Sequence, residues 1–326
     1  METLAHDIRV RTSVSGLGFA ILSAVSFGLS GSLGRGLLDA GWTSASAVSV
    51  RVLVAAVALL PFALTSLRGR WWLLREHAGL LVAYGLIAVG GCQLAYFNAV
   101  AQMPVAVALL VEYVAPVAVV GWMWLRHGQR PGVLTVSGGI LAAVGLVLVL
   151  DVVSGRGGAT PAGVAWALGA MAGAAFYFVV SSEDNGLPGV VLATGGLAVG
   201  GVALLAAGLA GVVPLAVSSS DVVFAGFTAP WWVTVLALAL VTAAVAYVAG
   251  IAATRRLGSR LASFVALAEV LAAMLFAWLL LDQLPRAVQL VGALLVLAGV
   301  VAVKLGEQRI VAVAPTVTPL EPELMP

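Results

Sequence analysis

Charged residues are scarce in this sequence. Lys, Arg, Asp and Glu make up 9% of its 326 residues, whereas hydrophobic residues make up 62%. A soluble domain carries roughly 25% charged residues, so this chain has too few to cover a water-soluble surface. Apolar stretches of eighteen or more residues recur from Leu17 to Val303. Each is long enough to cross a hydrocarbon core roughly 30 Å thick, which indicates an integral membrane protein.

Reactive side chains are also few. Cys92 is the only cysteine, which excludes an intrachain disulfide and a multi-cysteine metal site. The three histidines, His6, His77 and His127, lie far apart in the sequence, and no glycine-rich phosphate loop with a lysine occurs. We therefore expect no cofactor and no metal. The basic residues are spread over short loops rather than gathered in one patch, so we expect no nucleic-acid partner.

Breaks at glycine, proline and charged clusters divide the chain into ten predicted membrane helices. They cover residues 17–38, 43–65, 78–100, 104–125, 132–150, 162–180, 188–212, 230–252, 261–281 and 287–304. These stretches are too long and unbroken for barrel strands, and their many glycines and alanines favour closely packed helices. The predicted fold class is an all-α integral membrane protein.

The distribution of basic residues predicts the orientation. With the N-terminus inside, twelve of the sixteen basic residues lie on the cytoplasmic side and three, Arg35, Arg156 and Arg286, lie outside. The positive-inside rule therefore predicts that both termini are cytoplasmic. We expect the protein in the cytoplasmic membrane of the cell. Residues 1–16 are expected to form a cytoplasmic N-terminal tail. The proline-rich residues 305–326 are expected to form a disordered cytoplasmic tail.

The two halves of the chain resemble each other. Four residues of the first half recur 154 positions later, as the pairs Gln129 and Gln283, Pro131 and Pro285, Gly138 and Gly292, and Gly145 and Gly299. A shift of three residues then aligns Glu112 with Glu269. Because each half holds five predicted spans, an odd number, the second half must enter the membrane in the opposite orientation. The sequence thus predicts two inverted five-helix repeats, an arrangement that underlies many secondary transporters.

Two segments give the sequence a resemblance to a known family. Val50 to Val52 read V-R-V, and Pro104 to Pro116 read P-V-A-V-A-L-L-V-E-Y-V-A-P. With the layout of two five-helix halves, over residues 17–150 and 162–304, they resemble the EamA-like family of the drug/metabolite transporter superfamily. The second segment is most similar to bacterial threonine/homoserine exporters. The resemblance implies ten helices, cytoplasmic termini and export of amino acids or related metabolites.

The second half departs from this pattern at two places. Gly195 or Gly196 stands where the first half has Arg51, and Ala273 stands where it has Pro116. We therefore expect the functional symmetry of the two halves to be incomplete.

Three charged residues fall deep inside predicted spans, well away from the span ends: Arg51, Glu112 and Glu269. A charge in the membrane costs several kcal/mol unless it is paired or hydrated, so each is a candidate for substrate binding or coupling. Arg51 and Glu112 lie at similar depth, about eight residues or roughly 12 Å below the outer ends of their helices. Inversion of the second half brings Glu269 near the same midplane. The alternative interpretation is a structural bridge between Arg51 and Glu112.

Pro116 is expected to kink the fourth helix. Proline lacks the N–H that would bond the carbonyl of Glu112, four residues earlier. The freed carbonyl needs another partner in lipid, so this part of the helix is predicted to line a cavity or to meet other polar groups. The alternative is an ordinary proline kink.

Several uncharged polar residues are secondary candidates, and many polar residues of this kind serve only helix packing. They are Gln93, Tyr96, Asn98, Tyr113, Ser26, Ser30, Tyr177 and Tyr247.

Together these features predict a secondary transporter that exports small polar metabolites by alternating access, in a lipid bilayer. A channel or a non-transporting membrane subunit stays an alternative, and an intramembrane enzyme is disfavoured because no catalytic constellation is visible. Protons as the coupling ion, the cargo and the oligomeric state are left open by the sequence.

Overall fold

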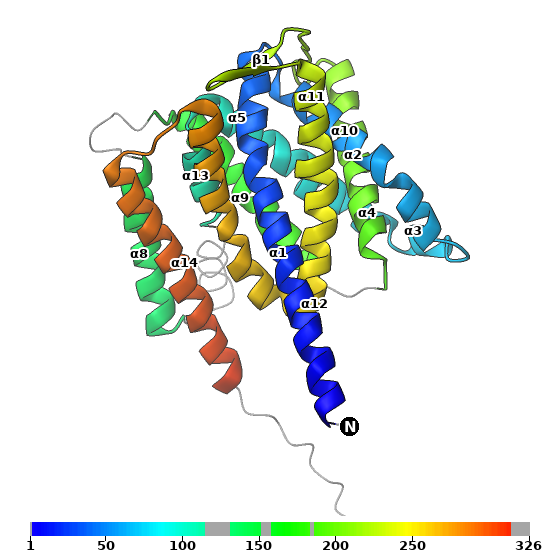
Figure 1. Cartoon of the computed structure of the whole chain (residues 1–326), viewed down its shortest axis with the longest axis vertical. Helices are drawn as coiled ribbons and strands as arrows, with labels where there is room; N and C mark the ends of the chain where they lie inside the picture. The colour runs from blue at the N-terminus through cyan, green and yellow to red at the C-terminus, as the bar shows by residue number, and fades with distance from the viewer. Residues whose placement is uncertain (1, 115–130, 151–157, 183–185, 314–326) are drawn as a thin grey trace, which may run out of the picture.

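A computed structural model of the chain describes residues 2–114, 131–150, 158–182 and 186–313, and shows a bundle of helices (Figure 1). The helices are α1 Glu2–Asp39, α2 Ser44–Ser66, α3 Trp72–Glu76, α4 Ala78–Ala83, α5 Cys92–Gln102, α6 Val105–Glu112, α8 Val133–Leu150, α9 Pro161–Ser182, α10 Gly189–Leu209, α11 Trp231–Leu236, α12 Ala246–Ala266, α13 Ala268–Leu281 and α14 Ala287–Val313. Two π-helical segments, η1 Tyr84–Gly91 and η2 Ala237–Val245, join α4 to α5 and α11 to α12.

Six helical stretches of the described chain are long and apolar enough to cross a membrane. They are Ser15–Asp39, Ser44–Ser66, Ala78–Gln102, Val133–Leu150, Gly189–Leu209 and Trp231–Leu257. Two shorter apolar helices, Ala268–Leu281 and Ala287–Val303, accompany them. The predicted class, a helical membrane protein, is confirmed at this level.

Local sequence signals explain where several helices begin. Thr43 caps α2, because its side-chain oxygen accepts a hydrogen bond from the Ser46 N–H. Proline stands directly before α6, α10 and α11, and it is the first residue of α9. Proline suits these positions because it fixes the backbone and lacks an N–H that the first turn would leave unpaired.

Some helix ends differ from the sequence prediction. The fourth helix was predicted over 104–125, but α6 ends at Glu112, four residues before Pro116. A turn at Tyr113 and Val114 follows it. Pro116 itself lies outside the described residues. The predicted connection at 253–260 is wrong, since α12 continues through it to Ala266. Helix α1 begins already at Glu2, and α14 continues to Val313, beyond their predicted spans.

A β-hairpin follows α10 and was not predicted. Strand β1, Val222–Phe224, pairs antiparallel with β2, Phe227–Ala229, through a turn in which Gly226 has φ +85. Glycine tolerates this positive φ at the second position of the turn without steric cost. Trp42 Nε1 donates to the Ser218 carbonyl at 2.9 Å, and the Ala225 N–H donates to the Leu280 carbonyl at 2.8 Å. The segment thus covers the ends of α1, α2 and α13; we call this the hairpin end of the bundle (Figure 1).

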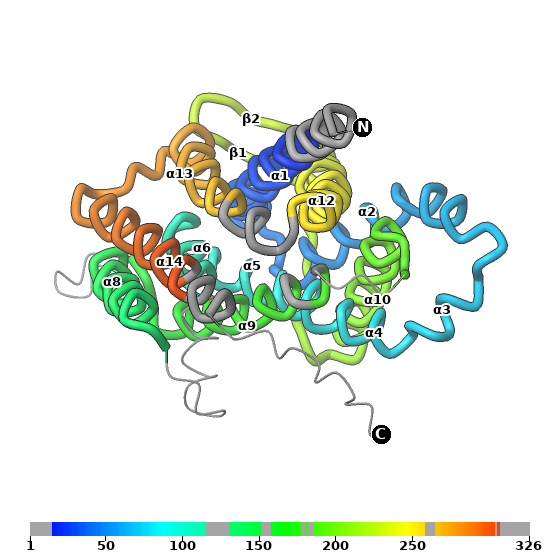
Figure 2. Tube along the Cα trace, turned by 90° about the horizontal axis from the view of Figure 1, so that it is seen from below, coloured from blue at the N-terminus to red at the C-terminus, as the bar shows by residue number. Residues whose placement is uncertain are grey.

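The two halves of the chain are interleaved. Helix α1 packs along α12 and α13, α2 packs along α10 and η2, and α5 packs along α9. Seen from below, the pair α8 and α14 stands at one side of the bundle, while α3 and α4 lie at the opposite side (Figure 2). The start of α1 and the end of α14 lie at the end away from the hairpin (Figure 1).

Glycines bring α8 and α14 into close contact. A Cβ on Gly145 would lie 2.7 Å from the Gly292 carbonyl oxygen, and a Cβ on Gly138 would lie 2.7 Å from the Gly299 carbonyl oxygen. These are the four glycines that recur in the two halves. Since the earlier glycine of each helix faces the later glycine of the other, α8 and α14 run antiparallel. Such close backbone approach is possible only where no side chain intervenes.

Candidate functional site

Arg51 lies at the centre of the bundle and is completely buried, at 0% exposure. It projects from the N-terminal half of α2. Its Nη1 donates to Gln93 Oε1 on α5 at 2.5 Å, and its Nη2 donates to the Thr242 carbonyl in η2 at 2.5 Å. The guanidinium carbon lies 5.6 Å from the centre of the Phe97 ring. One cation therefore joins two helices of the first half to one of the second.

The π-helical geometry of η2 explains why the Thr242 carbonyl is available. In an α-helix the Ala246 N–H would donate to Thr242, four residues earlier. Here it donates to the carbonyls of Val241 and Ala243 instead, passing over Thr242. Segment η1 repeats this pattern in the first half, where the Cys92 N–H donates to Ile87 and Val89 and passes over Ala88. Single π-helical turns inside longer helices are frequent at functional sites.

The two glutamates approach each other across the halves. Glu112 ends α6 and is followed directly by Tyr113, whose hydroxyl donates to Glu269 Oε2 at 2.7 Å. Glu269 lies in the first turn of α13, and both glutamates are partly buried. Tyr113 was only a secondary candidate from the sequence. It directly follows Glu112 and donates a hydrogen bond to Glu269, so it connects the two glutamate-bearing segments.

Arg51 does not form an ion pair with Glu112. Within the described residues no ion pair of 4.0 Å or less joins Arg51 to either glutamate. The Cys92 thiol makes a long contact to Glu112, with Sγ 4.0 Å from Oε1, and it also donates to the Ala170 carbonyl at 3.4 Å. The structural bridge that the sequence left open as an alternative is therefore absent.

Aromatic rings surround these polar groups. Gln93 Nε2 donates to the Tyr247 hydroxyl at 3.4 Å, and the Tyr247 ring meets the rings of Phe27 and Tyr177 edge to face, at 5.1 and 5.7 Å. Tyr177 in turn lies 6.1 Å from Tyr84, which is completely buried. Tyr84 and Phe97 were not among the sequence candidates. A phenylalanine in an apolar span carries no polar group that would single it out, and nothing in the sequence places Tyr84 beside the other tyrosines.

The remaining secondary candidates are placed less centrally or without a hydrogen bond. Tyr96 is buried beside Gly31 of α1, where a Cβ would collide with its hydroxyl. Ser26 and Ser30 are buried on α1. The backbone carbonyl of Asn98, rather than its side chain, accepts a hydrogen bond from Gln102 at 3.2 Å.

Four buried polar atoms of the described chain have no hydrogen-bond partner: Ser30 Oγ, Ser32 Oγ, Ser49 Oγ and Arg51 Nε. A buried polar group without a partner costs roughly 1–3 kcal/mol, and more when it is charged. An oxygen brought next to the Arg51 Nε–H would satisfy this donor. Among the described residues no group of three side chains is arranged to hold a metal ion.

Comparison with known proteins agrees with this architecture. One solved structure, described only as the crystal structure of a protein, superimposes with a TM-score of 0.60 at 18% identity, over 92% of this chain and 99% of that one. This shows that the fold is shared. No curated protein matches the sequence.

The family comparison is more specific. The EamA-like transporter family matches residues 14–151 and matches a second time over residues 161–305, so the chain carries two copies of the same unit. Membership points to a multi-pass membrane transporter of small molecules rather than an enzyme. On these two matches, which together cover nearly the whole sequence, the chain belongs to the EamA-like transporter family.

Proposed function

We propose that the chain is a secondary carrier that exports small polar metabolites, namely amino acids or related compounds, by alternating access. The observation that carries the proposal is the buried polar centre built from both halves. Arg51 is bound to Gln93 and to the Thr242 carbonyl, and Tyr113 is bound to Glu269. Movement of one half against the other must break or remake these contacts, so occupancy of the centre is coupled to the conformation.

The chemistry of the centre supports a cargo with a carboxylate and an ammonium group. The unused Nε of Arg51 offers a charge-assisted hydrogen bond to a carboxylate. Glu112 has no cationic partner among the described residues and suits an ammonium group. Gln93 and Tyr113 hold Arg51 and Glu269 in place. This pairing of charges fits the resemblance to threonine/homoserine exporters.

An inverted repeat with ten spans is part of the proposal. The two family matches indicate two copies, and the antiparallel contact of α8 with α14 through equivalent glycines is what a two-fold axis in the membrane plane would produce. The basic residues favour cytoplasmic termini in a cytoplasmic membrane, which places the hairpin end outside.

Proton coupling fits the charge balance of the centre. Two carboxyl groups, Glu112 and Glu269, stand against one guanidinium, and isolated buried charges are costly. A proton on one glutamate balances the centre whenever no cationic group of the cargo is bound. We therefore include protons as the coupling ion in the proposal.

Uptake into proteoliposomes by the purified protein, with a panel of radiolabelled amino acids and other small metabolites, tests the proposal. We expect uptake of one class of cargo by the native protein and its loss in Glu112→Gln. The matched control is Glu76→Gln, at the end of α3 and away from the centre. Equal uptake by native protein and Glu112→Gln would contradict the assignment of the site.

A further inference from the structure

Helix α6 is short, apolar and interrupted at both ends. Met103, with φ −155 and ψ 166, and Pro104, with φ −57 and ψ 142, separate it from α5. It ends after eight residues at Glu112, where a turn follows, and residues 105–111 are all buried. Changes in backbone angles at a few residues that flank a helix allow the helix to move as a unit. The breaks on either side give α6 this property.

A side chain of the second half holds the start of α6. Gln283 lies in the connection between α13 and α14, and its Oε1 accepts a hydrogen bond from the Val105 N–H at 3.3 Å. The first N–H groups of a helix have no partner inside the helix, so this contact satisfies a donor that α6 cannot satisfy itself. Loss of the contact weakens the hold on α6 in its present position.

The other end of α6 is held at the polar centre. Tyr113, the residue that follows Glu112, donates to Glu269 Oε2 at 2.7 Å. Glu112 lies seven residues after Val105, or roughly 10 Å along a helix. A cationic group that binds Glu269 competes with the Tyr113 hydroxyl for the same carboxylate. The position of α6 therefore depends on a contact at the hairpin end and on one that responds to the contents of the centre.

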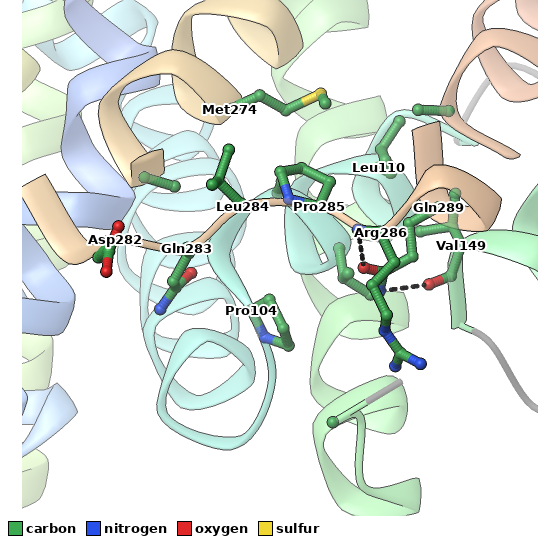
Figure 3. Close-up of a pocket in the computed structure, with 15 residues that line it drawn as sticks. Pro104, Leu110, Val149, Met274, Asp282, Gln283, Leu284, Pro285, Arg286 and Gln289 are labelled. Atoms are coloured by element: carbon green, nitrogen blue, oxygen red, sulfur yellow. Dashed lines mark hydrogen bonds between the residues drawn. The ribbon is translucent and has the colours of Figure 1, made fainter. Parts of the chain in front are cut away.

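A cavity of about 280 Å³ gives α6 room to move (Figure 3). Ala106, Val107 and Leu110 line it from α6, and Met274 lines it from α13. Gln283 lines the same cavity, so the side chain that holds α6 also has space beside it. In a closely packed interior a helix cannot shift without displacing its neighbours. Here α6 and its partner can shift before packed side chains are displaced.

We infer that α6 is the gate between the polar centre and the hairpin end, and that Gln283 is the latch that keeps it closed. Gln283 is a positioning residue, because it acts on the centre only through the position of α6. That a transported molecule passes this gate rests on the proposed function. The opening of α6 is measured without any transport.

The single cysteine of the chain reports the opening. Cys92 is buried, and its Sγ lies 4.0 Å from Glu112 Oε1, at the end of α6 that faces the centre. A membrane-impermeant methanethiosulfonate reagent is added to sealed vesicles of either orientation, so that it approaches from one side at a time. Gln283→Ala should raise the labelling rate from the hairpin side roughly two- to tenfold, the change in population that follows the loss of one hydrogen bond. The rate from the opposite side should not rise.

Two variants serve as controls. Gln283→Glu retains an acceptor oxygen for the Val105 N–H and should be labelled at the native rate. Gln289→Ala changes the same connection, but Gln289 bonds to the Arg286 N–H and the Val149 carbonyl (Figure 3), so the native rate is expected here too. If Gln283→Ala lowers the amount of folded protein, Gln283→Asn, which is shorter by one methylene group, takes its place.

Two results would overturn the inference. One is an unchanged rate from the hairpin side when Gln283 is replaced. The other is an equal rise from both sides, which a generally loosened bundle would give. Absence of uptake in proteoliposomes contradicts the proposed function alone, because the labelling of Cys92 needs no cargo.

Discussion

The Arg51 guanidinium is enclosed by protein and held by two neutral acceptors, Gln93 and the Thr242 carbonyl. Neutral acceptors orient a cation without cancelling its charge, whereas an ion pair would do both. Keeping an uncancelled charge in a membrane protein is costly, and such residues mark substrate or ion pathways. At the residue scale, this is the strongest sign of a binding site.

Replacement of Arg51 by lysine should abolish transport although the charge is retained. The planar guanidinium reaches Gln93, Thr242 and a ligand at the same time, while a lysine ammonium is a flexible point charge. We expect a loss of at least about 100-fold in initial uptake rate, the effect of about 2.7 kcal/mol. Thr242→Val is the matched control, because only the backbone carbonyl of Thr242 binds Arg51. Near-native uptake by Arg51→Lys would contradict this role.

Replacement of Tyr113 by phenylalanine removes the hydrogen bond to Glu269. A hydrogen bond to a charged group contributes about 1.5–3 kcal/mol, so the variant should unfold at lower temperature and transport more slowly. Glu269→Gln retains an acceptor oxygen and should be affected less in stability. The double variant measures the coupling between the two side chains, and additive effects on the melting temperature would show that they do not interact.

The charged candidates could be found from sequence, because a lone charge in an apolar stretch is conspicuous. Their partners could not. The Thr242 carbonyl is exposed by a local π-helical turn, and a backbone atom leaves no mark in the sequence. The contact of Tyr113 with Glu269 spans 156 positions and depends on how the halves pack.

At the scale of single elements, the two π-helical segments are placed alike in the two halves. Each lies within a longer helix. The first N–H after each segment donates to the carbonyls three and five residues earlier and not to the carbonyl four residues earlier. Sequence periodicity predicted the helices that contain them, over 78–100 and 230–252, but the change of helix type within an apolar run alters no pattern of residues. The helix ends at Glu112 and Ala266 were missed because they too lie within predicted apolar spans, where the residue pattern does not change.

Replacement of Gly145 by leucine should separate α8 from α14. The new Cβ would meet the backbone of α14 at Gly292 and Val296, which cannot move aside as a flexible side chain can. We expect a loss of roughly 1–3 kcal/mol or more of stability. Cys92 is buried and is the only cysteine, so reaction with a fluorogenic maleimide during heating reports unfolding.

The matched control for this variant is Gly18→Leu in α1. A Cβ on Gly18 meets no atom within 4 Å, so its melting temperature should equal that of the native protein. An unchanged melting temperature for Gly145→Leu would show that the contact of α8 with α14 does not stabilise the molecule.

At the scale of the whole molecule, helices of each half pack against helices of the other. Helix α1 contacts α12 and α13, and Ser23 Oγ of α1 donates to the Ala246 carbonyl at 2.9 Å. The polar centre therefore cannot rearrange within one half alone. The recurring glycines and glutamates predicted two related halves, but the interleaving of their helices follows from contacts that no local pattern encodes.

The orientation of the whole molecule can be tested through its ends. The start of α1 and the end of α14 lie at the same end of the bundle, so both termini should face one compartment (Figure 1). We expect a green fluorescent protein fused after Val313 to fluoresce and an alkaline phosphatase fused there to be inactive. An insertion of the phosphatase at Gly226, in the hairpin turn, should give the opposite result. Active phosphatase after Val313 would invert the predicted topology.

The central claim is that the two halves alternate around one shared site, and counterflow measures this most directly. Proteoliposomes are loaded with excess unlabelled cargo and diluted into a trace of the same cargo with a radiolabel, without any ion gradient. A carrier that alternates should accumulate the label transiently above its outside concentration, and Arg51→Lys should abolish this overshoot. Simple equilibration of the label without an overshoot by the native protein would identify a channel and contradict the account.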